Sequence, residues 1–177
     1  MAEQIVELAP GESKIVSFEA TPSEAKTYQV SVNGLSGSFV ATPSPVVGWV
    51  SPTSHRDPSG KWFWEEKAYD NDLATVGGVW IDPGEWSPYL ELLINETFID
   101  KIRFFGWWSV EIPFPIDVDV YYGGVWHDVY EGAYAHLSWV EKSIAGVQLV
   151  SKARVRFYND VLVRRPASLY EFQFYPV

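Results

Sequence analysis

Two pairs of carboxylates in the sequence have a spacing at which acid–base chemistry could occur. Glu65 and Glu66 are adjacent, and Asp117 and Asp119 are separated by one valine. Hydrolysis of a glycoside needs two carboxyl groups that flank the scissile bond, which makes both pairs candidates for that reaction. Asp117 and Asp119 alternate with valines, however, and a period of two places both aspartates on the solvent side of one strand. The pattern therefore predicts a solvated acidic face rather than a catalytic pair.

Other groups that could carry out catalysis are sparse. The three histidines, His55, His127 and His136, are far apart, and no two of them have the spacing of zinc ligands. Cysteine is absent, which excludes a thiolate metal site, a cysteine nucleophile and disulfide bonds. The sequence contains no nucleophile elbow, phosphate-binding loop or zinc signature. We therefore expect a protein that is not an enzyme.

The composition narrows the class of partner. The formal net charge is −10 and the isoelectric point is about 4.7. A protein that binds a phosphate backbone needs the opposite balance, so we expect no nucleic acid partner. No stretch approaches the ~20 apolar residues that span a bilayer, so we expect no membrane insertion. The opening MAEQIVELAP lacks the basic start and apolar run of a signal peptide.

The elements that must position any site are short β-strands. Alternation of polar and apolar residues is clear at 117–120 and 154–157, and Gly123–Gly124 is a hairpin turn signal. A helical turn is expected only within 131–145. Many short strands joined by turn-rich loops favour a sandwich or jelly roll. The predicted strands cover 90–94, 101–105, 116–122, 147–150, 153–158 and 170–175.

A change of composition near residue 45 predicts two parts, 1–45 and 46–177. All nine tryptophans lie at or after Trp49, and the proline-spaced stretch 42–45 separates the two compositions. In the first part, Tyr28, Val30 and Val32 alternate with polar residues, and the turn signal Asn33–Gly34 follows. We expect a hairpin here with a return strand over 38–41, preceded by strands over 5–8 and 14–19.

The first part resembles the C-terminal half of cell-adhesion-related Ig-like domains of bacteria and archaea. The resemblance covers about residues 3–42 and is carried by the segments 8–13, 16–18, 21–22, 27–30 and 32–39. A whole domain of that family is about twice as long, and a segment of this size without a disulfide or metal buries too little core to stand alone. The resemblance therefore implies a partial Ig-like β-arm that docks on another surface.

The second part resembles the galactose-binding-like jelly roll, the fold of discoidin domains, coagulation-factor type C domains and many carbohydrate-binding modules. Six segments occur in the family's order, with a departure at 76–78 and an insertion over 106–115. The resemblance implies an all-β jelly-roll sandwich with Trp80, Trp86 and Trp126 as structural core residues. The six segments are 68–75, 86–92, 99–104, 116–129, 153–158 and 167–174.

A structural calcium is implied by the same resemblance, because the family often binds this ion at its opening loop. Calcium takes oxygen ligands from carboxylates, hydroxyls and carbonyls of an irregular loop. The resemblance assigns Asp70, Asp72, Thr75 and Glu171 as candidate ligands, together with the carbonyls of the tyrosines at 69 and 170. The alternative is a solvated acidic turn, with Glu171 paired to one of the arginines at 154 and 156.

Aromatic residues at 104–108 are the candidate platform for a sugar, because tryptophan offers a flat apolar face with a polar edge. Gly106 allows the chain to turn there, and adjacent tryptophans cannot both point inward from a strand. Polar side chains at 158–165 could bind hydroxyl groups. The alternative is that the platform tryptophans fill the core or form a protein interface, and Trp139 is left open. The candidate ligand-binding residues are Trp107, Trp108, Tyr158, Asn159, Arg164 and Arg165.

Two functions remain. The first is a non-catalytic module that binds carbohydrate on a surface through loop aromatics. The second is a structural assembly protein, such as a phage capsid or tail decoration or a surface-layer component, whose N-terminal arm docks on a neighbouring subunit. Either function implies a glycan or protein surface as partner, a homo-oligomer in the second case, and a location outside the cell or on a virion surface.

Overall fold

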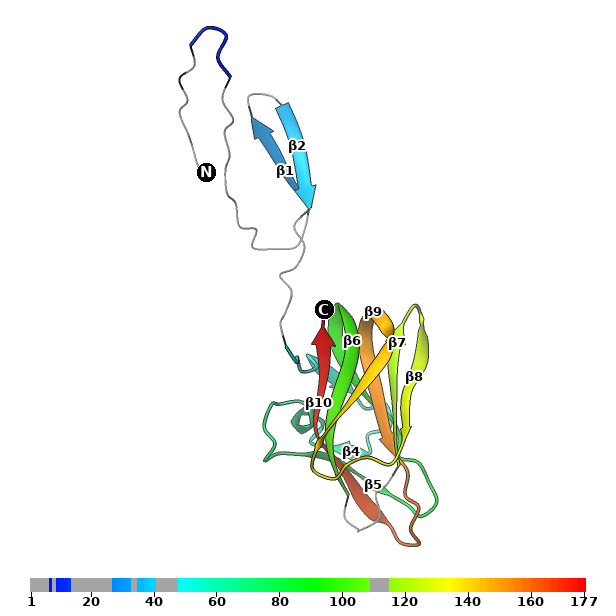
Figure 1. The fold of residues 1–177 in the computed structure, drawn as a ribbon. Coiled ribbons are helices and arrows are strands. Elements are labelled where there is room, and N and C mark those ends of the chain that lie inside the picture. The colour runs from blue at the N-terminus through cyan, green and yellow to red at the C-terminus, as the bar shows by residue number, and fades with distance from the viewer. Residues whose placement is uncertain (1–6, 8, 14–26, 33–34, 41–47, 109–114) are drawn as a thin grey trace. The chain divides into compact units, whose positions relative to one another are not determined.

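The chain divides into two compact units, Met1–Ser44 and Pro45–Val177. A computed structural model describes residues 7, 9–13, 27–32, 35–40, 48–108 and 115–177 (Figure 1). No helix among these residues is long and apolar enough to cross a membrane. The described strands of each unit pair in antiparallel fashion.

The first unit contains a two-stranded hairpin of β1 (Thr27–Val32) and β2 (Leu35–Val40). Val32 pairs directly with Leu35, which leaves two residues for the connection and confirms the predicted hairpin. The rings of Tyr28 and Phe39 stack across the pair with centroids 5.4 Å apart. The turn at 33–34, the expected strand over 14–19 and most of the one over 5–8 lie outside the described residues, so the Ig-like resemblance stays a prediction.

The second unit is a sandwich of antiparallel strands, as the sequence predicts. Gly123 and Gly124 have φ angles of 58° and 84°, the left-handed backbone that a two-residue hairpin turn requires. The elements are β3 (Ser54–Arg56), β4 (Trp62–Phe63), the 3₁₀ turn η1 (Glu65–Ala68), β5 (Gly77–Ile81), β6 (Leu90–Trp108), β7 (Ile116–Tyr122), β8 (Val125–Gly132), β9 (Trp139–Phe157) and β10 (Arg165–Pro176).

Two long strands, β6 and β9, pass from one layer of the sandwich to the other. Their pairing shifts register between Leu93 and Thr97, where the two strands bend. Sheet I consists of β4, β5, β10, the second half of β6 and the first half of β9. Sheet II consists of β3, the first half of β6, the second half of β9, β7 and β8. Figure 1 shows β6, β9 and β10 running the length of the unit.

The core lies between the two sheets and consists of alternate residues of each strand. Phe104 and Phe172 of sheet I and Val118 and Val155 of sheet II are fully buried. This alternation leaves every second side chain on the outer face of its sheet. The candidate site residues described below are found on these two outer faces and at the loops beside them.

The structure differs from the sequence-based expectation in three elements. The predicted strands 147–150 and 153–158 are joined in the single strand β9, which ends at Phe157. Residues 131–145 form strands and a turn rather than helix, and the described helical turn is η1, which places Glu65 and Glu66 in its first turn. The predicted strands 90–94 and 101–105 belong to the single strand β6, because a bulge bends this strand without ending it.

Candidate functional site

The acidic loop before β5 is held together by its own hydrogen bonds. The hydroxyl of Thr75 donates to both carboxylate oxygens of Asp70, at 2.9 and 2.8 Å, and lies 3.2 Å from the carbonyl oxygen of Asp72. The backbone N–H of Asp72 lies within reach of Asp70 Oδ1 and of Glu171 Oε1, each at 3.1 Å. The structure therefore brings together the side chains of Asp70, Thr75 and Glu171, with the backbone of Asp72 between them.

Glu171 is the buried carboxylate of this loop cluster. Its side chain is 1% exposed, and its Oε2 atom has no hydrogen-bond partner among the described residues. Burial raises the pKa of Glu171 to about 7, and the neighbouring negative charge of Asp70 adds to the shift, while the N–H groups of Asn71 and Asp72 oppose it. A buried anionic oxygen without a partner, beside further oxygen atoms, is a donor set that suits a hard cation such as Ca²⁺.

The loop is fixed to sheet I on its other side by Asn71. This residue adopts a left-handed backbone with φ of 63°, which asparagine tolerates better than most residues. Its Oδ1 accepts hydrogen bonds from Ser51 and Gln173, both at 2.9 Å. Gln173 in turn accepts a hydrogen bond from Arg103 Nε at 2.8 Å. The acidic loop is thus anchored to β10 and β6 before any ion binds.

The alternative for this loop predicts that Glu171 pairs with Arg154 or Arg156, and the structure contradicts it. Both arginines lie on sheet II, where they pair with other carboxylates. The open question of Trp139 also has an answer here. Its ring lies 3.9 Å from the guanidinium carbon of Arg103 and makes an edge contact with Phe105, so it packs on the outer face of sheet I.

Trp107 and Trp108 lie in β6, so the expectation that they occupy a loop is wrong. Gly106 is not a turn residue either, because it also lies within β6. The ring of Tyr134 packs so closely against it that a Cβ atom there would lie 2.9 Å from the ring. Trp108 is on the inner side and packs against the core, while Trp107 is on the outer side. Consecutive strand residues point to opposite faces, so the two tryptophans do not form one platform.

A different tryptophan shares the outer face with Trp107. Trp80 is 49% exposed, which contradicts its predicted place in the core. It pairs with Pro166 of β10, and Ser168, two residues on, pairs with Trp107. Residues two apart in a strand share a face, so Trp80 and Trp107 flank β10 on the outside of sheet I, with about 10 Å between their strands. No signal in the sequence could have identified it, because Val79, Trp80 and Ile81 are all apolar and show no alternation.

Of the remaining predicted ligand residues, Tyr158, Asn159 and Arg164 lie in the segment between β9 and β10, and Arg165 is the first residue of β10. Arg164 is exposed, forms a 3.3 Å ion pair with Asp82, and lies 5.7 Å from the ring of Trp80. Tyr158 packs on Trp86 with centroids 5.2 Å apart. The Nε of Arg165 is buried, without a hydrogen-bond partner among the described residues. Of the four, Arg164 alone lies beside an exposed tryptophan.

Asn159 is fully buried and holds this segment in shape. Its side-chain nitrogen donates to the carbonyl oxygens of Ile81 and Val163, both at 2.9 Å. Its Oδ1 accepts from the N–H of Val161 at 3.1 Å. The side chain of Asn159 therefore positions the loop that carries Arg164 and is not directed toward solvent.

The prediction that Asp117 and Asp119 lie on a solvated face is wrong, although both lie on the outer face of sheet II. Asp117 and Asp119 are 4% and 6% exposed. Each accepts a 2.7 Å hydrogen bond from an arginine Nε, Asp117 from Arg156 and Asp119 from Arg154. Burial and the charge of Asp117 raise the pKa of Asp119, although Arg154 opposes the shift. The aspartates are outward from the core, but the side chains around them exclude water.

Aromatic rings and cations alternate above these aspartates. Arg156 contacts the rings of Trp86 and Tyr89, both at 4.5 Å. Arg154 contacts Tyr89 at 3.9 Å and Trp126 at 4.4 Å. Neither Trp86 nor Trp126 belongs to the buried core, so both predicted core positions are wrong. Sequence patterning identifies strand faces, but it does not detect a layer of side chains that covers one of them.

Three carboxylates on sheet II lie close enough to share a cation. Asp117, Asp119 and Asp128 place one oxygen each within 4.8 Å of one another, and no other group of this kind occurs among the described residues. Two of them already have an arginine partner. This cluster therefore differs from Glu171, which forms no ion pair with a described side chain and feels the charge of Arg103, itself bonded to Gln173, only at longer range.

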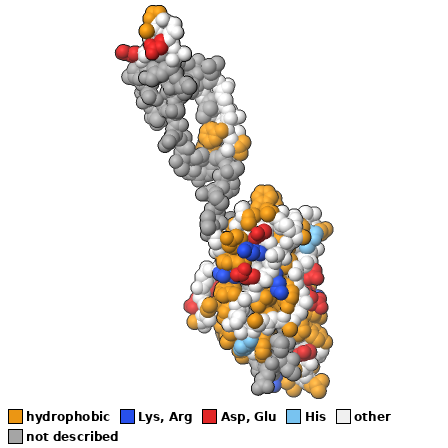
Figure 2. All heavy atoms as spheres, in the orientation of Figure 1, with side chains coloured by type: hydrophobic (Ala, Val, Ile, Leu, Met, Phe, Trp, Pro, Cys, Tyr) orange, Lys and Arg blue, Asp and Glu red, His pale blue; other side chains and the backbone are white. Residues whose placement is uncertain are grey.

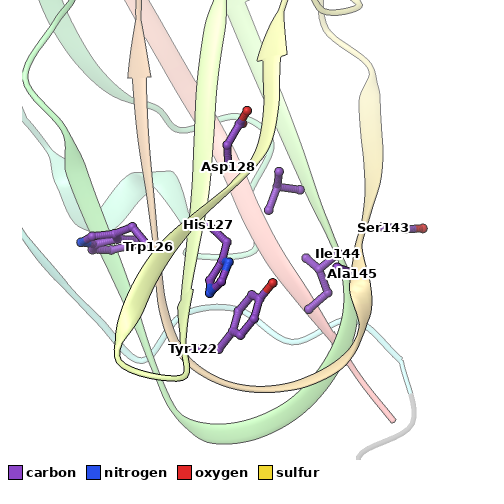
Figure 3. A pocket seen from close by; sticks show the side chains of 8 residues that line it. Tyr122, Trp126, His127, Asp128, Ser143, Ile144 and Ala145 are labelled. Atoms are coloured by element: carbon purple, nitrogen blue, oxygen red, sulfur yellow. The ribbon is translucent and has the colours of Figure 1, made fainter.

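A groove of about 610 Å³ opens between β8 and the first half of β9. Figure 3 shows Tyr122 and His127 side by side in it, with Ile144 on the opposite wall. The two rings stack with centroids 3.7 Å apart. On the face visible in Figure 2, acidic and basic side chains of this unit lie intermixed with hydrophobic ones, so that face presents no extended field of one sign.

No protein-family profile matches the sequence, and no curated protein matches it. Solved structures do match. One is a family 32 carbohydrate-binding module (CBM32) of AlyQ in complex with 4,5-unsaturated mannuronic acid, at TM-score 0.53 and 11% identity over 72% of this chain and 98% of that one. A second is CBM32-1 from a family 31 glycoside hydrolase of Clostridium perfringens, at TM-score 0.54 and 11% identity over 71% and 96%.

A third structure, CBM32-2 of GH31 bound to GalNAc, matches at TM-score 0.52 and 14% identity over 70% of this chain and 97% of that one. These similarities show a shared fold. The second unit of this chain is a galactose-binding-like jelly-roll sandwich, as the sequence resemblance implies.

Proposed function

We propose that this chain is a non-catalytic carbohydrate-binding module that recognises glycans on a surface outside the cell. The observation that carries the proposal is the pair Trp80 and Trp107, which flank β10 on the outer face of sheet I, with Arg164 beside the exposed ring. Structures of the same fold are carbohydrate-binding modules, seen with mannuronic acid, GalNAc and galactose. Their fold supports the ligand class but does not identify the sugar.

The predicted ligand residues take different roles in this proposal. Trp80 and Trp107 stack against the apolar faces of sugar rings, and Arg164 donates hydrogen bonds to hydroxyl oxygens. Tyr158 and Arg165 form the edge of the surface. Trp108 and Asn159 support it from the inside, Trp108 against the core and Asn159 through the loop that carries Arg164.

A structural calcium ion is part of the proposal. Asp70, Asp72, Thr75 and Glu171 would hold it, with the carbonyls of the tyrosines at 69 and 170, and the unpartnered Oε2 of Glu171 supports this assignment. The ion would supply positive charge to a buried carboxylate and tie the acidic loop to β10. It is a clamp, and the sugar is bound by other residues.

A glycan array, repeated in the presence of a chelator, tests the function. Trp80→Ala and Trp107→Ala should each weaken binding about tenfold, since each removes one aromatic contact. The matched control is Phe98→Ala, which removes another exposed aromatic side chain from the far half of β6. Binding that is unchanged in both tryptophan variants, or an array without any bound glycan, contradicts the proposal.

The assembly alternative, in which the N-terminal arm docks on a neighbouring subunit, stays a prediction. Its test is the solution mass. A monodisperse monomer whose first 45 residues resist proteolysis would count against it.

A further inference from the structure

A small cavity lies on the outer face of sheet II, away from the Trp80–Trp107 surface of sheet I. Its volume is about 250 Å³. Glu91 of β6 and Arg154 of β9 form its floor and are directly paired in register. The walls come from the loops before β4 and β6. The lining residues are Pro58, Ser59, Pro88, Tyr89, Glu91 and Arg154.

Arg154 is held rigidly at this floor. Its guanidinium group lies between the rings of Tyr89 and Trp126, at 3.9 and 4.4 Å, and its Nε donates to Asp119 at 2.7 Å. No hydrogen bond to a described residue uses its two terminal nitrogens. Because the ring contacts and the Asp119 bond already restrict the side chain, a ligand that binds these nitrogens orders little that is not ordered beforehand.

Glu91 also keeps hydrogen-bonding capacity. Its Oε2 accepts from the ammonium group of Lys152 at 3.3 Å, while Oε1 has no hydrogen-bond partner among the described residues. Lys152 therefore neutralises the charge of Glu91, and Asp119 neutralises the charge of Arg154. Directly opposite residues on neighbouring strands have Cβ atoms about 5 Å apart, so free donors and a free acceptor lie side by side.

The walls complete a surface that suits a sugar ring. Pro58, Pro88 and Tyr89 supply apolar contacts for C–H groups, while the floor supplies polar groups for hydroxyls. The charges around the cavity nearly balance, which suits a neutral ligand. Five carboxylates (Asp117, Asp119, Asp128, Glu91 and Glu131) and four cations (Arg56, Lys152, Arg154 and Arg156) lie on this face, so no excess of positive charge attracts an anion there.

We propose that the cavity between Glu91 and Arg154 is a second glycan subsite, which binds one neutral sugar ring through a vicinal diol. The terminal nitrogens of Arg154 donate to the two hydroxyl oxygens, and Glu91 Oε1 accepts a hydrogen bond from one hydroxyl. The proposal shares its class of ligand with the proposed function and uses none of its residues. With two subsites on the outer faces of opposite sheets, one module can engage two glycan chains.

Nuclear magnetic resonance titration of the full chain tests this subsite. D-galactose, D-glucose and D-mannose are added separately to 15N-labelled protein. At least one of them should shift the Arg154 Nε–Hε signal and the backbone amide signals of Ser59 and Glu91 in a saturable way. Saturable shifts around Trp80 and Trp107 report on the surface of the proposed function, so the two sites are followed separately in one experiment.

Glu91→Gln should weaken binding at the cavity about tenfold, since it replaces a charged hydrogen-bond acceptor by a neutral one. Glu96→Gln, an exposed carboxylate of the same strand, is the matched control and should leave the affinity unchanged. Pro58→Trp should abolish the shifts by filling the cavity while all charged residues remain. Trp107→Ala should leave the cavity shifts intact.

The absence of saturable cavity shifts with all three sugars overturns the second subsite, whether or not Trp80 and Trp107 respond. Cavity shifts that survive Pro58→Trp also overturn it. Should the cavity respond while the Trp80–Trp107 surface remains silent toward every glycan tested, the second subsite stands and the first binding surface is wrong.

Discussion

The second unit buries carboxylates in two places and neutralises them differently. On sheet II, Asp117 and Asp119 each accept a hydrogen bond from an arginine of the neighbouring strand. At the acidic loop, Glu171 is at least as deeply buried but meets backbone N–H groups and the negative charge of Asp70. The first site contains ion pairs of its own, whereas no described side chain forms an ion pair with Glu171, and Arg103 acts on it only at longer range.

This difference separates a structural layer from a site that is open to an external ion. A buried charge that has an internal partner gains little from an added cation. A buried carboxylate without such a partner keeps its proton up to a higher pH or binds a metal ion, because either lowers the cost of its burial. The comparison therefore predicts that the two sites respond oppositely to mutation and to calcium.

The largest change in the free energy of unfolding is expected when an internal cation is removed. Arg156→Ala leaves Asp117, which is 4% exposed, without its ion-pair partner and should reduce the free energy of unfolding by about 3 kcal/mol. Urea denaturation at neutral pH measures the change. A loss below about 1 kcal/mol would mean that the hydrogen bond from the Tyr89 hydroxyl or water compensates Asp117, and the contrast between the two sites would then fail.

Calcium should act on the other site. An ion concentration of 100 times its Kd should raise the free energy of unfolding by about 2.7 kcal/mol, since the ion binds the folded chain. Glu171→Gln should remove the increase, and the control Glu96→Gln should preserve it. Thermal unfolding with and without a chelator measures both. An equal response of wild type and Glu171→Gln would place the ion elsewhere.

When calcium is removed, the pH dependence of stability should also distinguish the acidic loop from sheet II. The pKa of Glu171 is raised in the folded chain from its ordinary 4.5 to about 7, so the folded state binds more protons than the unfolded state between these values. Stability should therefore fall as the pH rises through this window, by up to about 1.4 kcal/mol per pH unit. Urea denaturation across pH 4–8 with chelator should show this slope, and Glu171→Gln should flatten it.

The smallest effect is expected at the ion pair of Arg164 and Asp82, whose side chains are 62% and 63% exposed. Asp82→Ala should change the free energy of unfolding by less than about 0.5 kcal/mol, because solvent screens the pair. Thermal unfolding provides the measurement. A larger loss would show that this segment contributes to stability, which would weaken its assignment as a binding surface.

Much of the fold could be predicted because strand patterns are local. The hairpin at Gly123–Gly124 and the strands 116–122 and 170–175 follow from turn chemistry and alternation. The continuity of β6 could not be predicted. The interruption of its pattern comes from a register shift against β9, which bends the strand without ending it. The gathering of Asp70, Thr75 and Glu171 followed from a family resemblance, as loop residues about 100 positions from β10 carry no local signal of proximity.

The burial of individual side chains could not be predicted in the same way. Asp117 and Asp119 point away from the core, as their alternation predicts, yet they are buried because Trp86, Tyr89 and two arginines cover them. Trp80 shows the reverse, a large apolar side chain that remains exposed. Alternation reports on which face of a strand a residue lies, and it says nothing about what covers that face.

The sequence by itself determined that the second part of this chain is a sandwich of short β-strands, and its resemblance to a known family implied the jelly roll. The strands follow from local periodicity and turn residues. The tertiary structure decided which tryptophans face solvent, which carboxylates have their own cations and which one does not. Those outcomes depend on residues that the folding of β6, β9 and β10 brings together from distant positions, where packing and desolvation set the energy of each group.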